Sequence, residues 1–193
     1  EIIRILADST NRISEGEVLQ LSLKQKEILS KKDYFEIIDR KTAELFKASA
    51  ITAGSLASCS EDELISLTNF AISLGMNFQI KDDLLDYFGD EELTGKKIGK
   101  DFEEGKFTLP LIIALPLMLE EHKSMILETL FNGNKSDFKG IIKVIKDTGA
   151  IESVEEICNQ FSKTCLKSLE TFPESDYKTG LIDIAENINT RVS

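Results

Sequence analysis

The sequence predicts an all-α protein, and three observations lead to that prediction. Apolar residues recur every three or four positions through most of the 193 residues. Polar pairs typical of helix N-termini precede two of these segments. No segment of useful length shows the two-residue alternation of a half-buried strand. With no linker, repeat or low-complexity tract visible, we expect a single helical domain over residues 1–193.

Helical spacing and capping signals define the first half of the chain. An amphipathic run extends from Ile2 to Leu23. Asp33 is expected to cap the next helix, with Glu36 three residues later as its capping-box partner. The same pattern starts at Ser60 and opens a long helix over residues 61–88.

The second half begins with a segment of different composition. Residues 89–107 contain four glycines and many charges without helical spacing, which predicts a long loop. Loops of this length in compact domains usually have a function. Pro110 suits the first turn of a helix that runs to about Glu120, and Pro116 is expected to kink it. Further helices are predicted over 136–147, 151–171 and 175–190.

Composition excludes several classes of protein. The formal net charge of −11 argues against a nucleic-acid partner, because phosphate backbones require a basic face. The longest apolar stretch, 109–119, has 11 residues with two prolines and is too short for a transmembrane segment. Three cysteines form neither a disulfide framework nor a zinc pattern, which fits a cytoplasmic location.

The most informative motif is a cluster of aspartates in the long helix. Asp82 and Asp86 lie four residues apart and are neighbours on the helix surface, and Asp83 lies at the edge of the same face. Each like-charge pair at that spacing costs about 0.2–0.5 kcal/mol, which a hard cation such as Mg²⁺ would relieve. A solvated acidic face explains an isolated motif of this kind equally well. Gln79 on the same face and the apolar flanking residues favour a metal and oxyanion site.

Lysines separated by glycines follow in the predicted loop. Lys96, Lys97, Lys100 and Lys106 supply mobile point charges suited to diphosphate, and the glycines allow a backbone to approach a ligand closely. A basic loop beside an acidic metal site is the arrangement expected of a lid over a diphosphate. A surface loop without a ligand is the alternative. The spacing of glycines and the residue after Lys100 exclude a P-loop.

Two earlier segments place polar residues on helices. Glu17 and Gln20 share one helix face, and Lys41 with Thr42 interrupts an otherwise apolar helix. Taken alone, each of these residues is better explained by a structural role, as a contact between helices or a lysine whose stem lies along apolar surface.

Together and in order, these elements resemble the trans-isoprenyl (polyprenyl) diphosphate synthase family. The matching segments are GEVLQ at 16–20, KTAELF at 41–46, GMNFQIKDDLLDYFGD at 75–90, TGKKIGKDFEEGKFTLPLI at 94–112 and TGAIESVEE at 148–156. The resemblance implies a helical bundle of the isoprenoid synthase type, of which this chain is the C-terminal portion. Taken as a whole, the sequence is most similar to the bacterial long-chain members, such as the octaprenyl diphosphate synthases.

The resemblance also implies roles for the aspartates and a reaction. Asp82, Asp83 and Asp86 match the family's second aspartate-rich motif, which binds Mg²⁺ that bridges to an allylic prenyl diphosphate. The implied chemistry is ionisation of the allylic diphosphate, attack by isopentenyl diphosphate and loss of a proton. Electrostatic stabilisation of the departing charge is expected to be the main catalytic effect.

Other polar positions match residues of the same site. Three lysines match those that contact the diphosphate in the family: Lys41, Lys96 and Lys106. Thr42 and Gln79 match residues that steady the developing allylic cation or the proton-accepting leaving group, and Gln20 matches a glutamine that lines the cavity.

The sequence also departs from the family pattern. It contains no first aspartate-rich motif and no adjacent arginines, so it is expected to hold only the leaving-group half of a site and to be inactive alone. A homodimer, or association with an N-terminal half, is expected to cover apolar helix faces. The alternatives are a non-catalytic subunit that modulates an intact synthase and a relative of the terpene cyclases.

Overall fold

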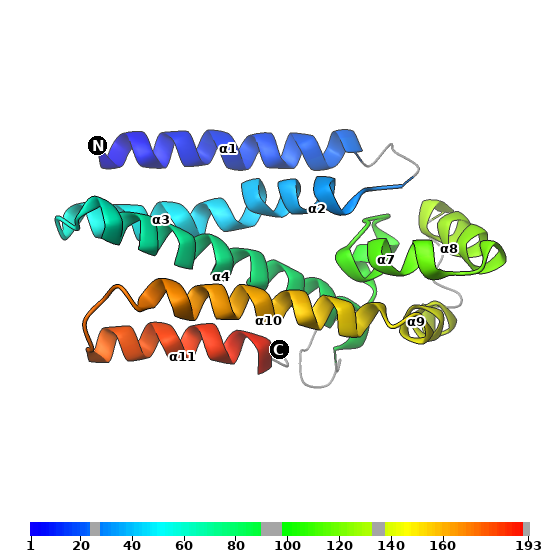
Figure 1. The fold of residues 1–193 in the computed structure, drawn as a ribbon. Helices are drawn as coiled ribbons and strands as arrows, with labels where there is room; N and C mark the ends of the chain where they lie inside the picture. Colours follow the sequence, from blue (N-terminus) through cyan, green and yellow to red (C-terminus); the bar gives the residue numbers. More distant parts are fainter. Residues whose placement is uncertain (24–27, 90–97, 133–137, 191–193) are drawn as a thin grey trace.

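The fold is helical throughout the part of the chain that the computed structural model describes, residues 1–23, 28–89, 98–132 and 138–190. Within these ranges no strand occurs, which confirms the all-α prediction. The long helices lie side by side as a layered bundle (Figure 1). From one face of the bundle to the other, the layers are α1 (Ile2–Leu23), α2 (Lys31–Ile38) with α3 (Glu44–Leu56), α4 (Glu61–Phe88), α10 (Ala150–Leu169) and α11 (Asp176–Thr190).

Capping boxes fix the starts of α2 and α4. The hydroxyl of Ser60 accepts from the backbone N–H of Glu63, whose carboxylate accepts from the N–H of Ser60 at 2.7 Å, as the sequence predicts. The predicted box at Asp33 and Glu36 is wrong by three residues. Ser30 is the N-cap, and Asp33 is the third helical residue that completes the box. Capping therefore begins one turn earlier than the sequence pattern indicates.

A π-helical segment, η1 (Asp39–Ala43), joins α2 to α3. The backbone N–H of Glu44 donates to the carbonyl of Asp39, five residues earlier. The buried positions accordingly step from Ile38 to Ala43 instead of advancing by three or four. The extra residue lets α2 and α3 both bury their apolar faces in the bundle while Lys41 and a neighbouring threonine stay only half-buried.

A group of shorter helices packs at the end of the bundle near the C-terminus of α4 (Figure 1). Their bounds are α6 (Lys100–Glu103), α7 (Leu109–Ala114), the 3₁₀ helix η2 (Leu115–Leu117), α8 (Glu120–Asn132) and α9 (Phe138–Asp147). The helix expected from Pro110 to Glu120, with a kink at Pro116, is shorter than predicted. The α-helix ends at Ala114, and a 3₁₀ turn that contains Pro116 follows. The loop predicted over residues 89–107 contains the short helix α6, and its residues 90–97 lie outside the described part of the chain.

The most apolar stretch of the sequence belongs to this region. Leu109, Leu111 and Leu115 are buried in the largest hydrophobic cluster, together with residues of α2, α4, α8, α9 and α10. Among the described residues, no helix is long and apolar enough to cross a bilayer.

The last two helices match their predicted ranges closely. Gly149, with φ of 73°, occupies the left-handed conformation that precedes α10. A buried polar cluster then ties these helices to α4: the Asn77 amide donates to Ser162 at 3.0 Å and to Asn189 at 3.0 Å. Hydrogen bonds in such a setting favour one packing register, because slipping would leave buried polar groups without partners.

Candidate functional site

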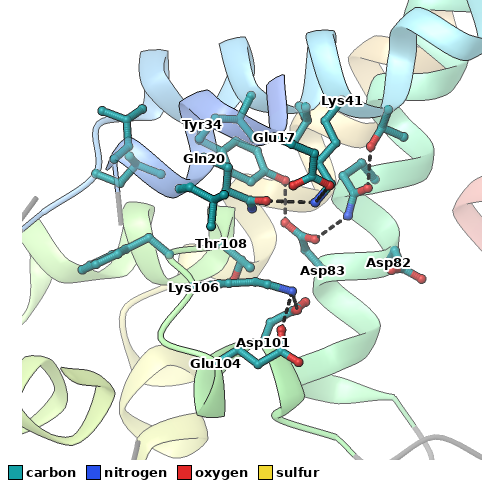
Figure 2. Close-up of a pocket in the computed structure, with 18 of the residues that line it drawn as sticks. Glu17, Gln20, Tyr34, Lys41, Asp82, Asp83, Asp101, Glu104, Lys106 and Thr108 are labelled. Carbon is teal, nitrogen blue, oxygen red and sulfur yellow. Dashed lines mark hydrogen bonds and ion pairs between the residues drawn. The ribbon is translucent and has the colours of Figure 1, made fainter. Parts of the chain in front are cut away.

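A cavity of about 410 Å³ opens between the C-terminal half of α1, the segment α2–η1, the C-terminal half of α4, and α6 with the residues that follow it (Figure 2). Side chains far apart in the sequence converge there. Seven of the nine predicted site residues line it: Gln20, Lys41, Thr42, Gln79, Asp82, Asp83 and Lys106. Of the other two, Asp86 does not line the cavity, and Lys96 lies outside the described residues.

Asp83 is the centre of a chain of hydrogen bonds at the back of the cavity. The Tyr34 hydroxyl donates to Asp83 Oδ2 at 2.7 Å, and Gln79 Nε2 donates to Asp83 Oδ1 at 2.9 Å. Thr42 Oγ1 donates in turn to Gln79 Oε1 at 2.8 Å. The amide of Gln79 is thereby oriented, because its Nε2 donates to the carboxylate and its oxygen faces Thr42 of η1.

Burial changes the acidity of Asp83 and Tyr34. Asp83 is only 4% exposed, and burial raises the pKa of its carboxyl to about 7, although the hydrogen bonds from Tyr34 and Gln79 act in the opposite direction. Burial and the nearby Asp83 charge also raise the pKa of Tyr34 well above its ordinary value, so that this hydroxyl keeps its proton and donates. Asp83 is therefore a carboxylate without enough nearby positive charge to balance it.

Lys41 enters the cavity from η1 and is held by two residues of α1. Its Nζ lies 2.8 Å from Glu17 Oε1 and donates to Gln20 Oε1 at 2.9 Å. The shared helix face of Glu17 and Gln20, visible in the sequence, thus serves to direct this lysine (Figure 2). The amphipathic position explains the interruption of the apolar pattern at Lys41.

Lys106 enters from the opposite wall and is also ion-paired. Its Nζ lies 2.8 Å from Asp101 Oδ1 and 2.8 Å from Glu104 Oε2. Burial lowers the pKa of Lys106, but its hydrogen bonds to the two carboxylates outweigh burial and raise it above the usual value for lysine. In this conformation both described lysines of the cavity are bound by acidic side chains of the protein itself.

The three aspartates of the motif have different surroundings. Asp82 and Asp83 line the cavity, whereas the carboxylate of Asp86 accepts from the backbone N–H groups of Lys100 and Asp101, at 3.0 Å each, and so caps the first turn of α6. Over the described ranges, no three histidine, cysteine or acidic side chains are grouped closely enough to hold a metal ion. The three carboxylates thus do not converge in this conformation.

Several residues of the site carried no clear signal in the sequence. Tyr34 is a single aromatic residue 49 positions before Asp83, and Asp101 and Glu104 stand in a segment with many charges. Thr108 lines the cavity and is itself buried. Only Asp101 had a usable indication, since it follows the glycine–lysine pattern quoted above.

The charge balance of the cavity indicates what it can bind. Among the described residues, five acidic side chains line it against two lysines: Glu17, Asp82, Asp83, Asp101 and Glu104 against Lys41 and Lys106. An anion alone would meet net repulsion there. Carboxylate oxygens are the ligands preferred by hard divalent cations, which commonly bridge carboxylates to phosphate oxygens. The donor set therefore fits Mg²⁺ bound together with a phosphate group.

Comparison with known proteins identifies relatives over nearly the whole chain. The octaprenyl diphosphate synthase of Escherichia coli is 32% identical over 186 residues, which cover 96% of this chain and 58% of that protein. The all-trans-nonaprenyl-diphosphate synthase (geranyl-diphosphate specific) of Rhodobacter capsulatus is 34% identical over 183 residues, 95% of this chain and 56% of that protein.

Solved structures give the same result for the fold. A polyprenyl synthase from Caulobacter crescentus, solved in complex with calcium and isoprenyl diphosphate, superposes with a TM-score of 0.93 at 32% identity. The match covers all of this chain and 59% of that one. The chain thus spans about three fifths of the length of the relatives it matches. Residues 1–147 match the Polyprenyl synthetase family, and the chain belongs to that family.

Proposed function

We propose that the cavity binds the diphosphate of an allylic prenyl substrate together with Mg²⁺, and that the chain forms the leaving-group half of a prenyltransferase site. The observation that carries this proposal is the pairing of two lysines with an excess of carboxylates around one cavity. A cavity of that charge accepts a diphosphate only when cations accompany it. The relatives' names, which specify prenyl diphosphates, support the same class of substrate.

Asp82 and Asp83 are the side chains that would hold the cation. Bound Mg²⁺ would supply positive charge to the diphosphate as its bond to the allylic carbon breaks. Asp83 gains from such a partner, because it is buried and its carboxyl has a raised pKa. Asp86 could take part only after it releases the backbone amides of Lys100 and Asp101.

The lysines would act on the leaving group. When a diphosphate enters, Lys41 would exchange Glu17, and Lys106 would exchange Asp101 and Glu104, for phosphate oxygens. Each exchange would keep the lysine paired with an anion, while the carboxylate that it releases would turn to solvent or to the accompanying cation. Positive charges already placed at the cavity walls would then stabilise the departing diphosphate.

Thr42 and Gln79 are placed to act beside the developing allylic cation. Because the Nε2 of Gln79 donates to Asp83, the side-chain oxygens of Gln79 and Thr42 would be the groups that face positive charge. Gln20 would keep Lys41 directed into the cavity before the diphosphate binds.

The complete reaction also requires isopentenyl diphosphate, and the chain covers about three fifths of the length of the relatives that it matches. We therefore propose that transfer needs a homodimer or an additional segment. The three free cysteines fit a cytoplasmic location.

Thermal unfolding tests the binding step. Mg²⁺ with inorganic diphosphate should raise the melting temperature of the unmodified chain, because a ligand that binds the folded state stabilises it. Asp82→Ala should remove the increase, whereas Asp62→Ala, at an exposed position of the same helix, should keep it. An unmodified chain that shows no increase would contradict the proposal.

Prenyl transfer itself can be followed with labelled isopentenyl diphosphate. The chain should be inactive alone and should gain activity when mixed with the part of the Escherichia coli relative that it does not match. If the diphosphate binds but no mixture is active, the non-catalytic modulator becomes the better explanation.

A further inference from the structure

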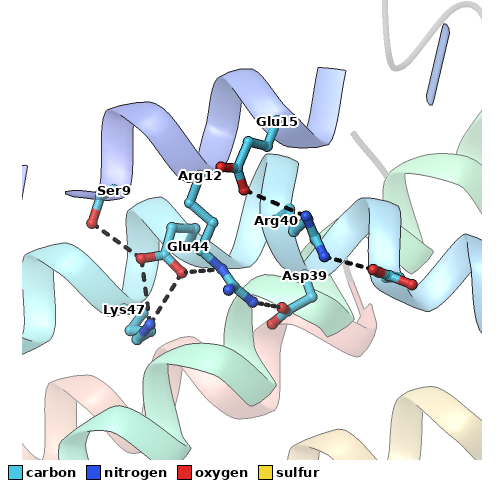
Figure 3. Close-up of polar contacts among 8 residues, drawn as sticks. Ser9, Arg12, Glu15, Asp39, Arg40, Glu44 and Lys47 are labelled. Atoms are coloured by element: carbon cyan, nitrogen blue, oxygen red, sulfur yellow. Dashed lines mark hydrogen bonds and ion pairs between the residues drawn. The ribbon is translucent and has the colours of Figure 1, made fainter. Parts of the chain in front are cut away.

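The π-helical segment η1 carries Lys41 and Thr42, and charged side chains hold it against α1 (Figure 3). Arg12 of α1 contacts both ends of this segment. Its Nη2 donates to Asp39 Oδ2 at 2.6 Å, and its Nε forms an ion pair with Glu44 Oε2 at 2.9 Å. A single guanidinium group thus bridges two carboxylates that stand five residues apart.

The bridged residues are the same two that the π hydrogen bond joins. The backbone N–H of Glu44 donates to the carbonyl of Asp39. In an α-helix, side chains five residues apart point about 140° away from each other around the axis. The wider π turn closes that interval, so both carboxylates can reach one arginine. Arg12 therefore contacts an arrangement that an uninterrupted α-helix would not present.

The remaining contacts of Glu44 show that this junction is built into the interior. Glu44 is only 5% exposed, and it also accepts from Ser9 Oγ at 3.1 Å and pairs with Lys47 at 3.2 Å. A buried carboxylate requires such partners. On the other side of the segment, Arg40 pairs with Glu15 of α1 at 3.4 Å (Figure 3).

The backbones of α1 and η1 also touch beside these ion pairs. A methyl group added at Gly16 would lie 2.9 Å from the backbone N of Lys41 and 2.9 Å from Cβ of Arg40, so a glycine is required for this approach. The next turn of α1 supplies Glu17 and Gln20, which hold the Lys41 ammonium group. Helix α1 thus determines both where the backbone of Lys41 lies and where its side chain points.

We propose that Arg12 is a positioning residue for Lys41. By bridging Asp39 and Glu44, it keeps the π turn in the register that directs Lys41 and Thr42 into the cavity. The consequence for diphosphate contact rests on the proposed function, but the positioning itself can be measured without any ligand.

Competitive lysine acetylation, read by peptide mass spectrometry, measures this role. Lys106 lies on the opposite wall of the same cavity and serves as an internal reference. In Arg12→Met without ligand, labelling of Lys41 relative to Lys106 should rise roughly threefold, the effect expected when a partly exposed ion pair is lost. Arg4→Met is the matched control, because Arg4 lies on the same helix in an exposed pair with Asp8, and it should leave the ratio unchanged.

A second arm of the experiment adds Mg²⁺ and saturating inorganic diphosphate. The ligand should protect both lysines from acetylation in the unmodified chain and in Arg4→Met. In Arg12→Met it should protect Lys106 but not Lys41. An unchanged ratio of Lys41 to Lys106 acetylation in folded Arg12→Met would overturn the inference. An equal increase in the acetylation of both lysines would overturn it as well.

Two further outcomes are also decisive. If Arg12→Met does not fold by circular dichroism, Arg12→Lys provides the same test, because one ammonium group cannot span both carboxylates; an unchanged ratio in that variant overturns the inference. If diphosphate protects neither lysine in the unmodified chain, the proposed function fails, and the ligand-free ratio still decides the role of Arg12.

Discussion

Replacing Asp83 with asparagine should stabilise the chain in metal-free buffer, and increasingly so as the pH rises. Asp83 is buried, and its pKa is about 7 in the folded protein against an ordinary value of 3.8. Between these values the folded state holds a proton that the unfolded state has lost. Stability from this group is therefore complete below the ordinary pKa and declines as the pH rises towards the folded one.

The size of the effect follows from the two pKa values. Each pKa unit corresponds to 1.36 kcal/mol, so the ionised carboxylate destabilises the apo chain by roughly 4 kcal/mol above neutral pH. Between about pH 5 and pH 8 the penalty should grow by roughly 2–3 kcal/mol. Asparagine avoids this penalty and can still accept from Gln79 and pair with the Tyr34 hydroxyl, so most of the difference should appear as increased stability.

Urea unfolding at several pH values, followed by circular dichroism with a chelator present, measures the difference. The gap between Asp83→Asn and the unmodified chain should widen with pH, while Asp183→Asn, at an exposed position of α11, should follow the unmodified chain. A constant gap from about pH 5 to pH 8 would refute the reasoning that burial raises the pKa of Asp83.

Three other experiments test separate parts of the structure. Tyr34→Phe removes a donor to Asp83 and should cost about 1–3 kcal/mol in urea unfolding above neutral pH, and less in acid; an equal cost at both would contradict the ion-dipole character of this contact. Gly16→Ala should cost about 1–3 kcal/mol through overpacking against η1, whereas Gly180→Ala, where nothing lies within 4 Å, should add about 0.5–1 kcal/mol; equal effects would show that the helices do not approach as described. The apolar side chains of Ile3 and Val18 are 85% and 65% exposed, so sedimentation should detect a dimer or a larger species. Sedimentation as a stable monomer would contradict this expectation.

Local patterns explain why most of the fold was predictable. Helical spacing and the capping box at Ser60 depend on neighbouring residues, and the structure reproduces the helices that they indicate. The capping pattern at Asp33 failed because Ser30 offers an equally good cap one turn earlier, and the sequence does not rank the two. The end of α7 before Pro116 is similar, since a proline can kink a helix or end it.

The site was predictable only where its residues match a family motif. Lys41, Asp83 and Lys106 meet at one cavity, as expected from the resemblance. Tyr34 could not be inferred, because its contact with Asp83 arises from the packing of α2 on α4 and leaves no local pattern. The cap that Asp86 provides to α6 likewise depends on the path of the chain after α4. The π turn has no sequence signature, although the five-residue step between buried positions becomes plain once the structure is known.

The central claim is that this cavity binds a diphosphate through a divalent cation, and calorimetric titration of inorganic diphosphate at several Mg²⁺ concentrations tests it most directly. Five acidic side chains surround two lysines in the part of the cavity that the structure describes, so the account predicts weak or undetectable binding without Mg²⁺ and an affinity that increases with the Mg²⁺ concentration. Asp82→Ala should abolish this increase. A diphosphate affinity that is the same with and without Mg²⁺, or no binding at any Mg²⁺ concentration, would contradict the account.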